Sequence, residues 1–146
     1  MFGIFKKKDM HHIAEGMVKE RQAKIAVMSP AELGQEIKDA LAEYQRLVGH
    51  NWTLHRAEYD DATFAAAERD DLHDLLARKN DIPHFDEYVN ELKKTDQKWQ
   101  QFCLKSIEEH LKDGKRYTDE SELKTKPWWW LIDRLDQLSP EQRSEI

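Results

Sequence analysis

Residues 126–138 read KPWWWLIDRLDQL, and the rest of the chain must fold around this stretch. Pro127 suits the first position of a helix, where its missing N–H leaves no hydrogen bond unmade. Pro140 favours an end at Ser139, because the residue before a proline is pushed out of the helical region. The spacing of apolar residues between the two prolines predicts a helix over 127–138. Its apolar stripe consists of Trp128, Leu131, Ile132, Leu135 and Leu138.

The three consecutive tryptophans cannot all face one core from such a helix. Successive residues advance by about 100° around a helix, so Trp129 lies on the flank of the stripe and Trp130 points away from it, beside Arg134. One interpretation places all three rings in the core of a bundle, because large aromatic side chains dominate burial. The other makes Trp130, with Trp129 and Arg134, an anchor for a partner, since tryptophan and arginine are enriched at interface hot spots.

The bulk properties indicate a single helical domain over residues 1–146. A chain of this length buries roughly 70% of its unfolded surface and can support a core without covalent staples. The one cysteine, Cys103, allows no internal disulfide, which fits a reducing compartment. No apolar run approaches the length of a membrane span. We therefore expect a cytoplasmic protein.

Capping signals and helical spacing place the other elements. Ser29, Pro30 and Glu32 form a capping box that opens a helix over 30–48. The same periodicity predicts further helices over 10–27, 51–79 and 84–112. Residues 1–9 are expected to form a flexible arm of apolar and basic residues, and residues 114–126 a loop. The predicted fold is an all-α, irregular bundle of about five helices, with the tryptophan helix at one end.

The charge of the chain is uneven. Residues 1–28 carry six basic and three acidic residues, a net of +3, so the total of −6 leaves −9 for residues 29–146. An acidic body excludes sequence-independent binding to nucleic acid, which needs clustered Lys and Arg. The acidic run over 58–74 is either a solvated helix surface or a docking surface for a basic partner. Its candidate binding residues are Glu58, Asp60, Asp61, Asp70, Asp71 and Asp74.

The sequence contains no strong catalytic motif. It lacks a glycine-rich phosphate loop, a CxxC pair, an HExxH motif and a Gly-x-Ser-x-Gly motif. His55 and Glu58 have the spacing of a metal-binding pair in a helical bundle, but such sites use two pairs on different helices and the chain offers one. No cofactor is expected. Asp96 falls in the middle of the apolar stripe of residues 84–112, where a carboxylate needs a partner or a raised pKa.

These observations favour a non-catalytic domain that binds a protein partner. In its concrete form the hypothesis is an acidic inhibitor or immunity-type protein that neutralises a basic partner such as a nuclease toxin. The acidic run would steer the partner, and Trp129, Trp130 and Arg134 would anchor it. Two alternatives stay open. One is a metal-dependent helical-bundle enzyme that uses His55 and Glu58, and the other is an adaptor or structural subunit of an oligomer, whose number of copies the sequence does not define.

Overall fold

The computed structural model describes the backbone of residues 7–50, 56–111 and 116–146, and the side chains of 15–50, 62–111 and 116–146. Within these ranges it contains five α-helices and no strand, which confirms the predicted all-α class. None of the described helices is long and apolar enough to cross a membrane. The helices are α1 (Lys7–Ala26), α2 (Pro30–Gly49), α3 (Arg56–Leu76), α4 (Phe85–His110) and α5 (Pro140–Arg143).

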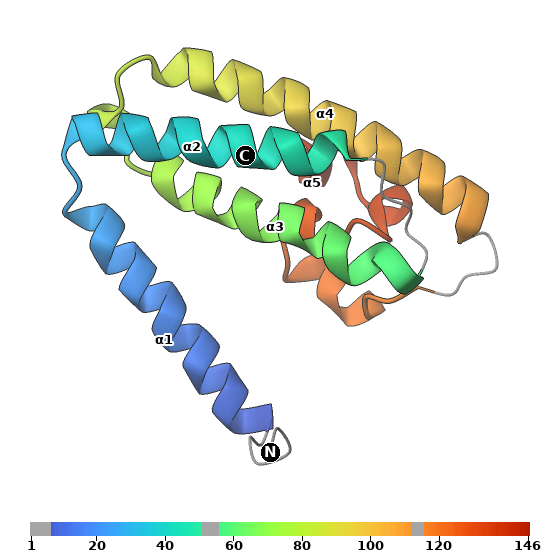
Figure 1. Cartoon of the computed structure of the whole chain (residues 1–146). Helices are drawn as coiled ribbons and strands as arrows, with labels where there is room; N and C mark the ends of the chain where they lie inside the picture. The colour runs from blue at the N-terminus through green and yellow to red at the C-terminus, as the bar shows by residue number, and fades with distance from the viewer. Residues whose placement is uncertain (1–6, 51–55, 112–115) are drawn as a thin grey trace.

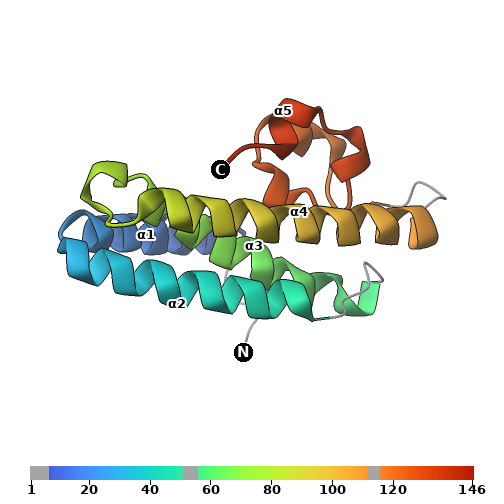
Figure 2. The same ribbon diagram turned by 90° about the horizontal axis from the view of Figure 1, so that it is seen from above.

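Helices α2, α3 and α4 lie side by side and form the bundle (Figure 1). Helix α1 leaves the beginning of α2 at an angle and projects away from the other helices. The segment that follows residue 116, which includes α5, packs on α3 and α4 on the side away from α2 (Figure 2). The core therefore has two parts, one between the three long helices and one under the C-terminal segment.

The long helices begin and end close to their predicted positions. Ser29 and Glu32 exchange the two hydrogen bonds of a capping box at the start of α2, as their spacing predicts. Helix α2 buries the stripe of apolar residues that recurs every three or four positions. The buried members of this stripe are Leu33, Ile37, Leu41, Tyr44, Leu47 and Val48. Helix α3 meets them with the small side chains of Ala62, Ala65 and Ala66.

Helix α1 contacts the bundle through its C-terminal half. Ile25 is buried, and Arg21 forms ion pairs with Asp71 and Asp74 of α3. Arg78, just beyond α3, donates hydrogen bonds to the main-chain oxygens of Ile25 and Met28 at the end of α1. The helix begins at Lys7, within the stretch 1–9 that was predicted as an arm, and residues 1–6 lie outside the described part of the chain.

The predicted helix over 127–138 is wrong. The chain instead forms two 3-10 helices, η4 (Trp128–Trp130) and η5 (Leu135–Gln137). Pro127 has an extended backbone with ψ 158° and precedes η4 rather than beginning an α-helix. Leu131, Ile132 and Asp133 are all buried in succession, whereas an α-helix packed on a bundle keeps one side towards solvent. The five residues of the predicted stripe are nevertheless all buried.

Asp133 explains why the backbone departs from a regular helix. Its side chain is fully buried and accepts hydrogen bonds from the main-chain N–H groups of Tyr117 and Thr118, at 2.6 and 2.8 Å. The hydroxyl of Thr118 donates a third, at 2.6 Å. Arg116 also donates to the main-chain oxygen of Asp133. Hydrogen bonds thus join residues 116–118 to Asp133, and the predicted loop over 114–126 contains another 3-10 helix, η3 (Glu120–Lys124).

Candidate functional site

The predicted tryptophan anchor is largely turned inwards. The indole N–H groups of Trp129 and Trp130 both donate to the carboxylate of Asp70 on α3, at 2.7 and 2.9 Å. Trp129 is only 1% exposed, while Trp130 is half-buried. Arg134 is half-buried and donates hydrogen bonds to the main-chain oxygen of Thr118 and to the Gln137 side chain. The predicted binding set thus contains three residues that contact one another, namely Asp70, Trp129 and Trp130.

The remaining members of the predicted set divide into two groups. Asp71 and Asp74 contact Arg21 of α1, so they lie where α1 meets α3. The side chains of Glu58, Asp60 and Asp61 lie outside the described residues, as does His55. Among the side chains that are described, no group of three or more His, Cys, Asp and Glu is arranged to hold a metal ion.

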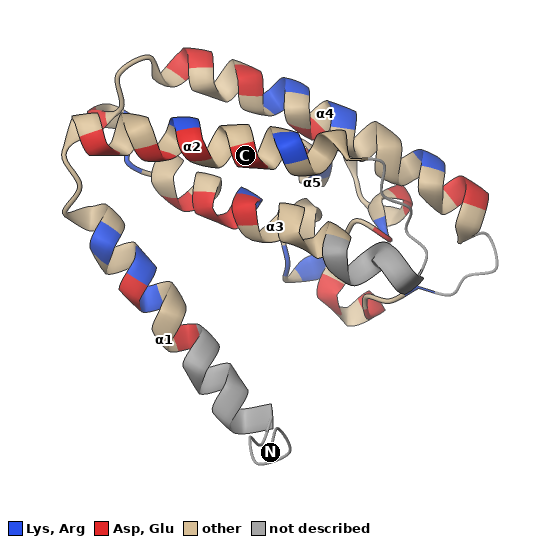
Figure 3. Ribbon diagram, viewed as in Figure 1, with Lys and Arg blue, Asp and Glu red and all other residues tan. Residues whose placement is uncertain are grey.

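A cluster of carboxylates spans α2 and α3, where acidic residues colour both ribbons (Figure 3). Partial burial raises the pKa of Glu68, and the nearby charges of Asp71 and Glu43 raise it further. The pKa of Asp71 is also raised, first by partial burial and in smaller part by like charges that include Glu36, although Arg21 lowers it. We call the four residues Glu36, Glu43, Glu68 and Asp71 the acidic face.

The α2 half of this face was not predicted from the sequence. Glu36 and Glu43 lie seven residues apart on one flank of the buried stripe of α2, and both precede Glu68 in the sequence. Their spacing places them on one side of a helix, which was the available signal. That this side adjoins the acidic residues of α3 follows only from the packing of the two helices.

Phe64 stands at the edge of the acidic face. It lies one turn before Glu68 on α3, and the spacing i, i+4, i+7 puts Phe64, Glu68 and Asp71 on the same side of the helix. The ring of Phe64 is 60% exposed. On the projecting helix α1, Met17 is 67% exposed. Single exposed apolar side chains are common on soluble proteins, but an aromatic ring beside clustered carboxylates combines the two features of a polar–apolar docking surface.

A second group of polar residues lies inside the bundle. Arg69 on α3 is fully buried and binds both carboxylate oxygens of Asp96 on α4, each at 3.0 Å. The hydroxyl of Tyr44 on α2 donates to the same carboxylate at 2.7 Å. Burial raises the pKa of Asp96, while Arg69 and Tyr44 act to lower it. Asp96 therefore has the partners that its predicted burial demands.

This buried group extends to the C-terminal segment. The Arg69 guanidinium lies over the ring of Trp129, with 4.3 Å from Cζ to the ring centroid. The main-chain oxygen of Glu145 accepts hydrogen bonds from Trp128 at 3.0 Å and from Arg69 at 3.5 Å. The ion pair between Arg69 of α3 and Asp96 of α4 is thus contacted by side chains from α2 and η4.

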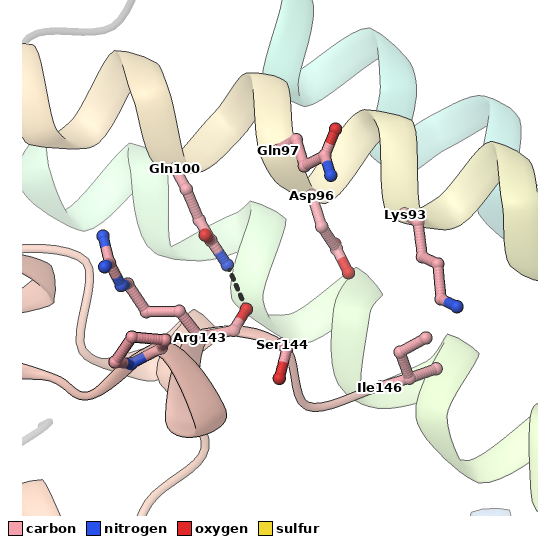
Figure 4. Close-up of a pocket in the computed structure, with 8 residues that line it drawn as sticks. Lys93, Asp96, Gln97, Gln100, Arg143, Ser144 and Ile146 are labelled. Carbon is pink, nitrogen blue, oxygen red and sulfur yellow. Dashed lines mark hydrogen bonds between the residues drawn. The ribbon is translucent and has the colours of Figure 1, made fainter.

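A cavity of about 430 Å³ adjoins Asp96, between α4 and the C-terminal segment (Figure 4). One wall comes from α4 and the other from α5 and the residues that follow it. Gln100 of α4 donates a hydrogen bond across the cavity to the main-chain oxygen of Arg143, at 2.6 Å. The lining residues are Lys93, Asp96, Gln97, Gln100, Pro140, Arg143, Ser144 and Ile146.

Comparisons with protein families, with characterised proteins and with solved structures find no match for this chain. The acidic face, Phe64 and the cavity are therefore the features of the molecule that bear on its function.

Proposed function

We propose that this protein is a non-catalytic binding domain whose acidic face and Phe64 receive a basic, amphipathic segment of a protein partner. The observation that carries this proposal is the exposure of Phe64 on the same side of α3 as Glu68, whose pKa is raised by partial burial and further by the charges of Asp71 and Glu43. Glu43 already pairs with Arg46 and Asp71 with Arg21, so a cationic side chain of the partner would chiefly relieve the repulsion that Glu68 meets from these neighbours. An apolar side chain on the same segment would remove the Phe64 ring from water.

Helix α1 supports the proposal by its own contact with this surface. Arg21, from α1, already forms ion pairs with Asp71 and Asp74. The helix then projects away from α2 and α3, so it covers only one end of the acidic face (Figure 1). A basic helix of the partner would form ion pairs with the other carboxylates of the face, as Arg21 does with Asp71.

The charge of the chain supports a basic partner in particular. The net charge is −6, and residues 29–146 carry more negative charge than the whole. Opposite charge on two proteins speeds their association and makes it sensitive to salt. In its concrete form the proposal is a cytoplasmic inhibitor or immunity-type protein that neutralises a basic protein such as a nuclease toxin.

The test compares variants of the acidic face against a purified partner. The partner is first captured from native lysate at low salt, but capture alone does not test the proposal. Phe64→Ser should weaken binding about tenfold, which corresponds to about 1.4 kcal/mol. Glu43→Gln combined with Glu68→Gln should slow association and reduce its salt dependence.

The matched control is Glu91→Gln combined with Glu108→Gln. Both residues are exposed on α4, so this variant removes the same charge away from the acidic face. It should bind like the original protein. If the partner binds the Phe64 variant, the acidic-face variant and the α4 variant equally well, the acidic face is not the binding surface.

A further inference from the structure

We infer that helix α1 lies in a docking groove from which a helix of the basic partner displaces it. The partner's helix places an arginine where Arg21 lies and an aliphatic residue where Ile25 lies. This displacement rests on the proposed function, because it extends the partner's contact from the acidic face to the end that α1 covers. We call the groove on α2 and α3 the α1 seat. Its residues are Glu36, Ala40, Asp71, Asp74, Leu75 and Ala77.

Arg21 shows which charged group the α1 seat recognises. Its Nη1 group forms an ion pair with Asp71 at 3.1 Å, and its Nε group donates to Asp74 at 3.1 Å. Asp71 and Asp74 are three residues apart, so they share one side of α3. A guanidinium donates in several directions from one rigid plane, whereas a lysine carries a single nitrogen. The seat therefore favours arginine over lysine.

Ile25 shows which apolar group the seat recognises. It is buried and lies four residues after Arg21, so both side chains project from the same side of α1. Two cavities flank it, one of about 260 Å³ beside α3 and one of about 180 Å³ between α1, α2 and α3. Because Ile25 lines both cavities, it fills only the middle of the seat. A partner helix with an arginine followed four positions later by an aliphatic residue matches this arrangement.

The contacts that hold α1 in the seat are weak. Arg21 and both of its partners are partly exposed, and ion pairs between such groups contribute little to stability. The cavities beside Ile25 leave part of its surface without atoms to pack against. One turn before Arg21, Met17 and Val18 are exposed where α1 projects from the bundle (Figure 1). A helix that lies along both the seat and the acidic face also covers Phe64, which α1 leaves exposed.

The test uses the full chain and, as the probe, a synthetic peptide with the sequence of residues 7–28. The peptide competes with α1 for the seat, so one substitution has opposite effects in the two molecules. In the chain, Arg21→Gln weakens the hold of α1 and should raise the affinity for the peptide about fivefold, because the seat is vacant more often. In the peptide, the same substitution should lower the affinity about tenfold. NMR shifts of the backbone amides of Asp71 and Leu75 follow both titrations.

Two peptide variants separate recognition from bulk charge. Arg21→Lys keeps the charge but cannot donate to both carboxylates, so it should bind as weakly as Arg21→Gln. Lys19→Met removes a charge from an exposed position two residues before Arg21, on the opposite side of α1. It is the matched control and should bind like the original peptide, and in the chain it should leave the affinity for the peptide unchanged.

Three results would overturn the displacement of α1. They are a peptide that does not saturate, an Arg21→Gln chain that binds the peptide or the purified partner less tightly, and a peptide affinity that falls as much with Lys19→Met as with Arg21→Gln. A chain that dimerises in sedimentation, and no longer does so with Arg21→Gln, would show that a second copy occupies the seat instead of another protein.

The outcome for the seat is separate from the outcome for the proposed function. If the peptide does not bind but Phe64→Ser still weakens binding of the purified partner, only the displacement of α1 is wrong. If the peptide behaves as expected but Phe64→Ser and the acidic-face variant bind the partner normally, the seat takes helices and the acidic face is not the binding surface.

Discussion

The side chain of Arg69 contacts three different parts of the structure. It pairs with Asp96, lies over Trp129 and reaches the main-chain oxygen of Glu145. Its Nη1 group is buried and has no hydrogen-bond partner among the described residues, and the rings of Trp129 and, at a longer distance, Trp128 add electrostatic stabilisation to the guanidinium. Removing two charges from water is unfavourable, and a buried pair is therefore weak evidence for stability. What the pair provides is a fixed position for α3, α4 and the C-terminal segment relative to one another.

Removing one partner of this pair should destabilise the fold far more than replacing both partners with apolar residues. Asp96→Ala leaves the Arg69 charge buried and unpaired, and we expect the free energy of unfolding to fall by about 3–5 kcal/mol. Tyr44→Phe removes one hydrogen bond to a charged group and should lower it by about 1.5–3 kcal/mol. Urea unfolding of each variant measures both values.

A combined variant separates charge burial from loss of packing. Tyr44→Phe, Arg69→Met and Asp96→Leu together remove every charge and donor of the group, so most of the stability lost in Asp96→Ala should return. If the combined variant is as unstable as Asp96→Ala, packing around Asp96 matters more than its charge.

At the scale of elements, the predictable parts of the structure are those with local causes. The capping box at Ser29 joins residues three apart, and the apolar stripe of α4 recurs within single turns, so both can be recognised in the sequence. The burial of the stripe from Trp128 to Leu138 was predicted correctly for the same reason. Its backbone was not, because Asp133 binds Thr118 and the indoles bind Asp70, up to 60 residues away.

The candidate site was less predictable than the fold for a related reason. In the sequence, Asp70 belongs to the acidic run and Trp129 and Trp130 to the predicted anchor, yet in the structure both indoles donate hydrogen bonds to Asp70. Lys93 and Arg143 lie 50 residues apart in sequence and share a cavity only because α5 folds back on α4. Residue spacing reveals which side chains share a side of one helix, but not which sides of different helices meet.

Helix α1 should separate from the bundle without the bundle unfolding. Its end is held by Arg78, which donates to the main-chain oxygens of Ile25 and Met28, and by the ion pairs of Arg21. Arg78→Met removes those hydrogen bonds and leaves the carbonyl groups without them. Amide hydrogen exchange should then become faster in residues 15–27 and stay unchanged in α2 and α4.

The matched control is Lys38→Met, at an exposed position of α2. It should change the exchange rates neither in residues 15–27 nor in α2 and α4. Faster exchange throughout α2–α4 would show that α1 and the bundle unfold together.

At the scale of the whole molecule, Glu68 of the acidic face lowers the stability of the fold that carries it. Partial burial, and in smaller part repulsion from Asp71 and Glu43, keep the pKa of Glu68 above its ordinary value. Between the unfolded and folded pKa values, the folded protein therefore binds more protons than the unfolded chain does. Its free energy of unfolding must then fall as the pH rises through the folded pKa of Glu68. A charge arrangement that opposes folding at neutral pH is expected where the charges serve binding, as the proposed function requires.

This linkage predicts that Glu68→Gln stabilises the protein at pH 7. We expect a gain of about 0.2–0.5 kcal/mol, the usual size of repulsion between like charges on a helix surface. The gain should disappear at a pH well below 4.5, the ordinary pKa of a glutamic acid, because Glu68 is then protonated in both states. It should also shrink in high salt, which screens the repulsion. Paired urea titrations of the original protein and the variant measure this difference, with Glu91→Gln on α4 as the control for loss of one charge elsewhere. If Glu68→Gln lowers the stability at pH 7, or if its gain persists unchanged in acid, repulsion at Glu68 does not oppose folding. The physical argument for a face kept acidic for a basic partner would then lose its support.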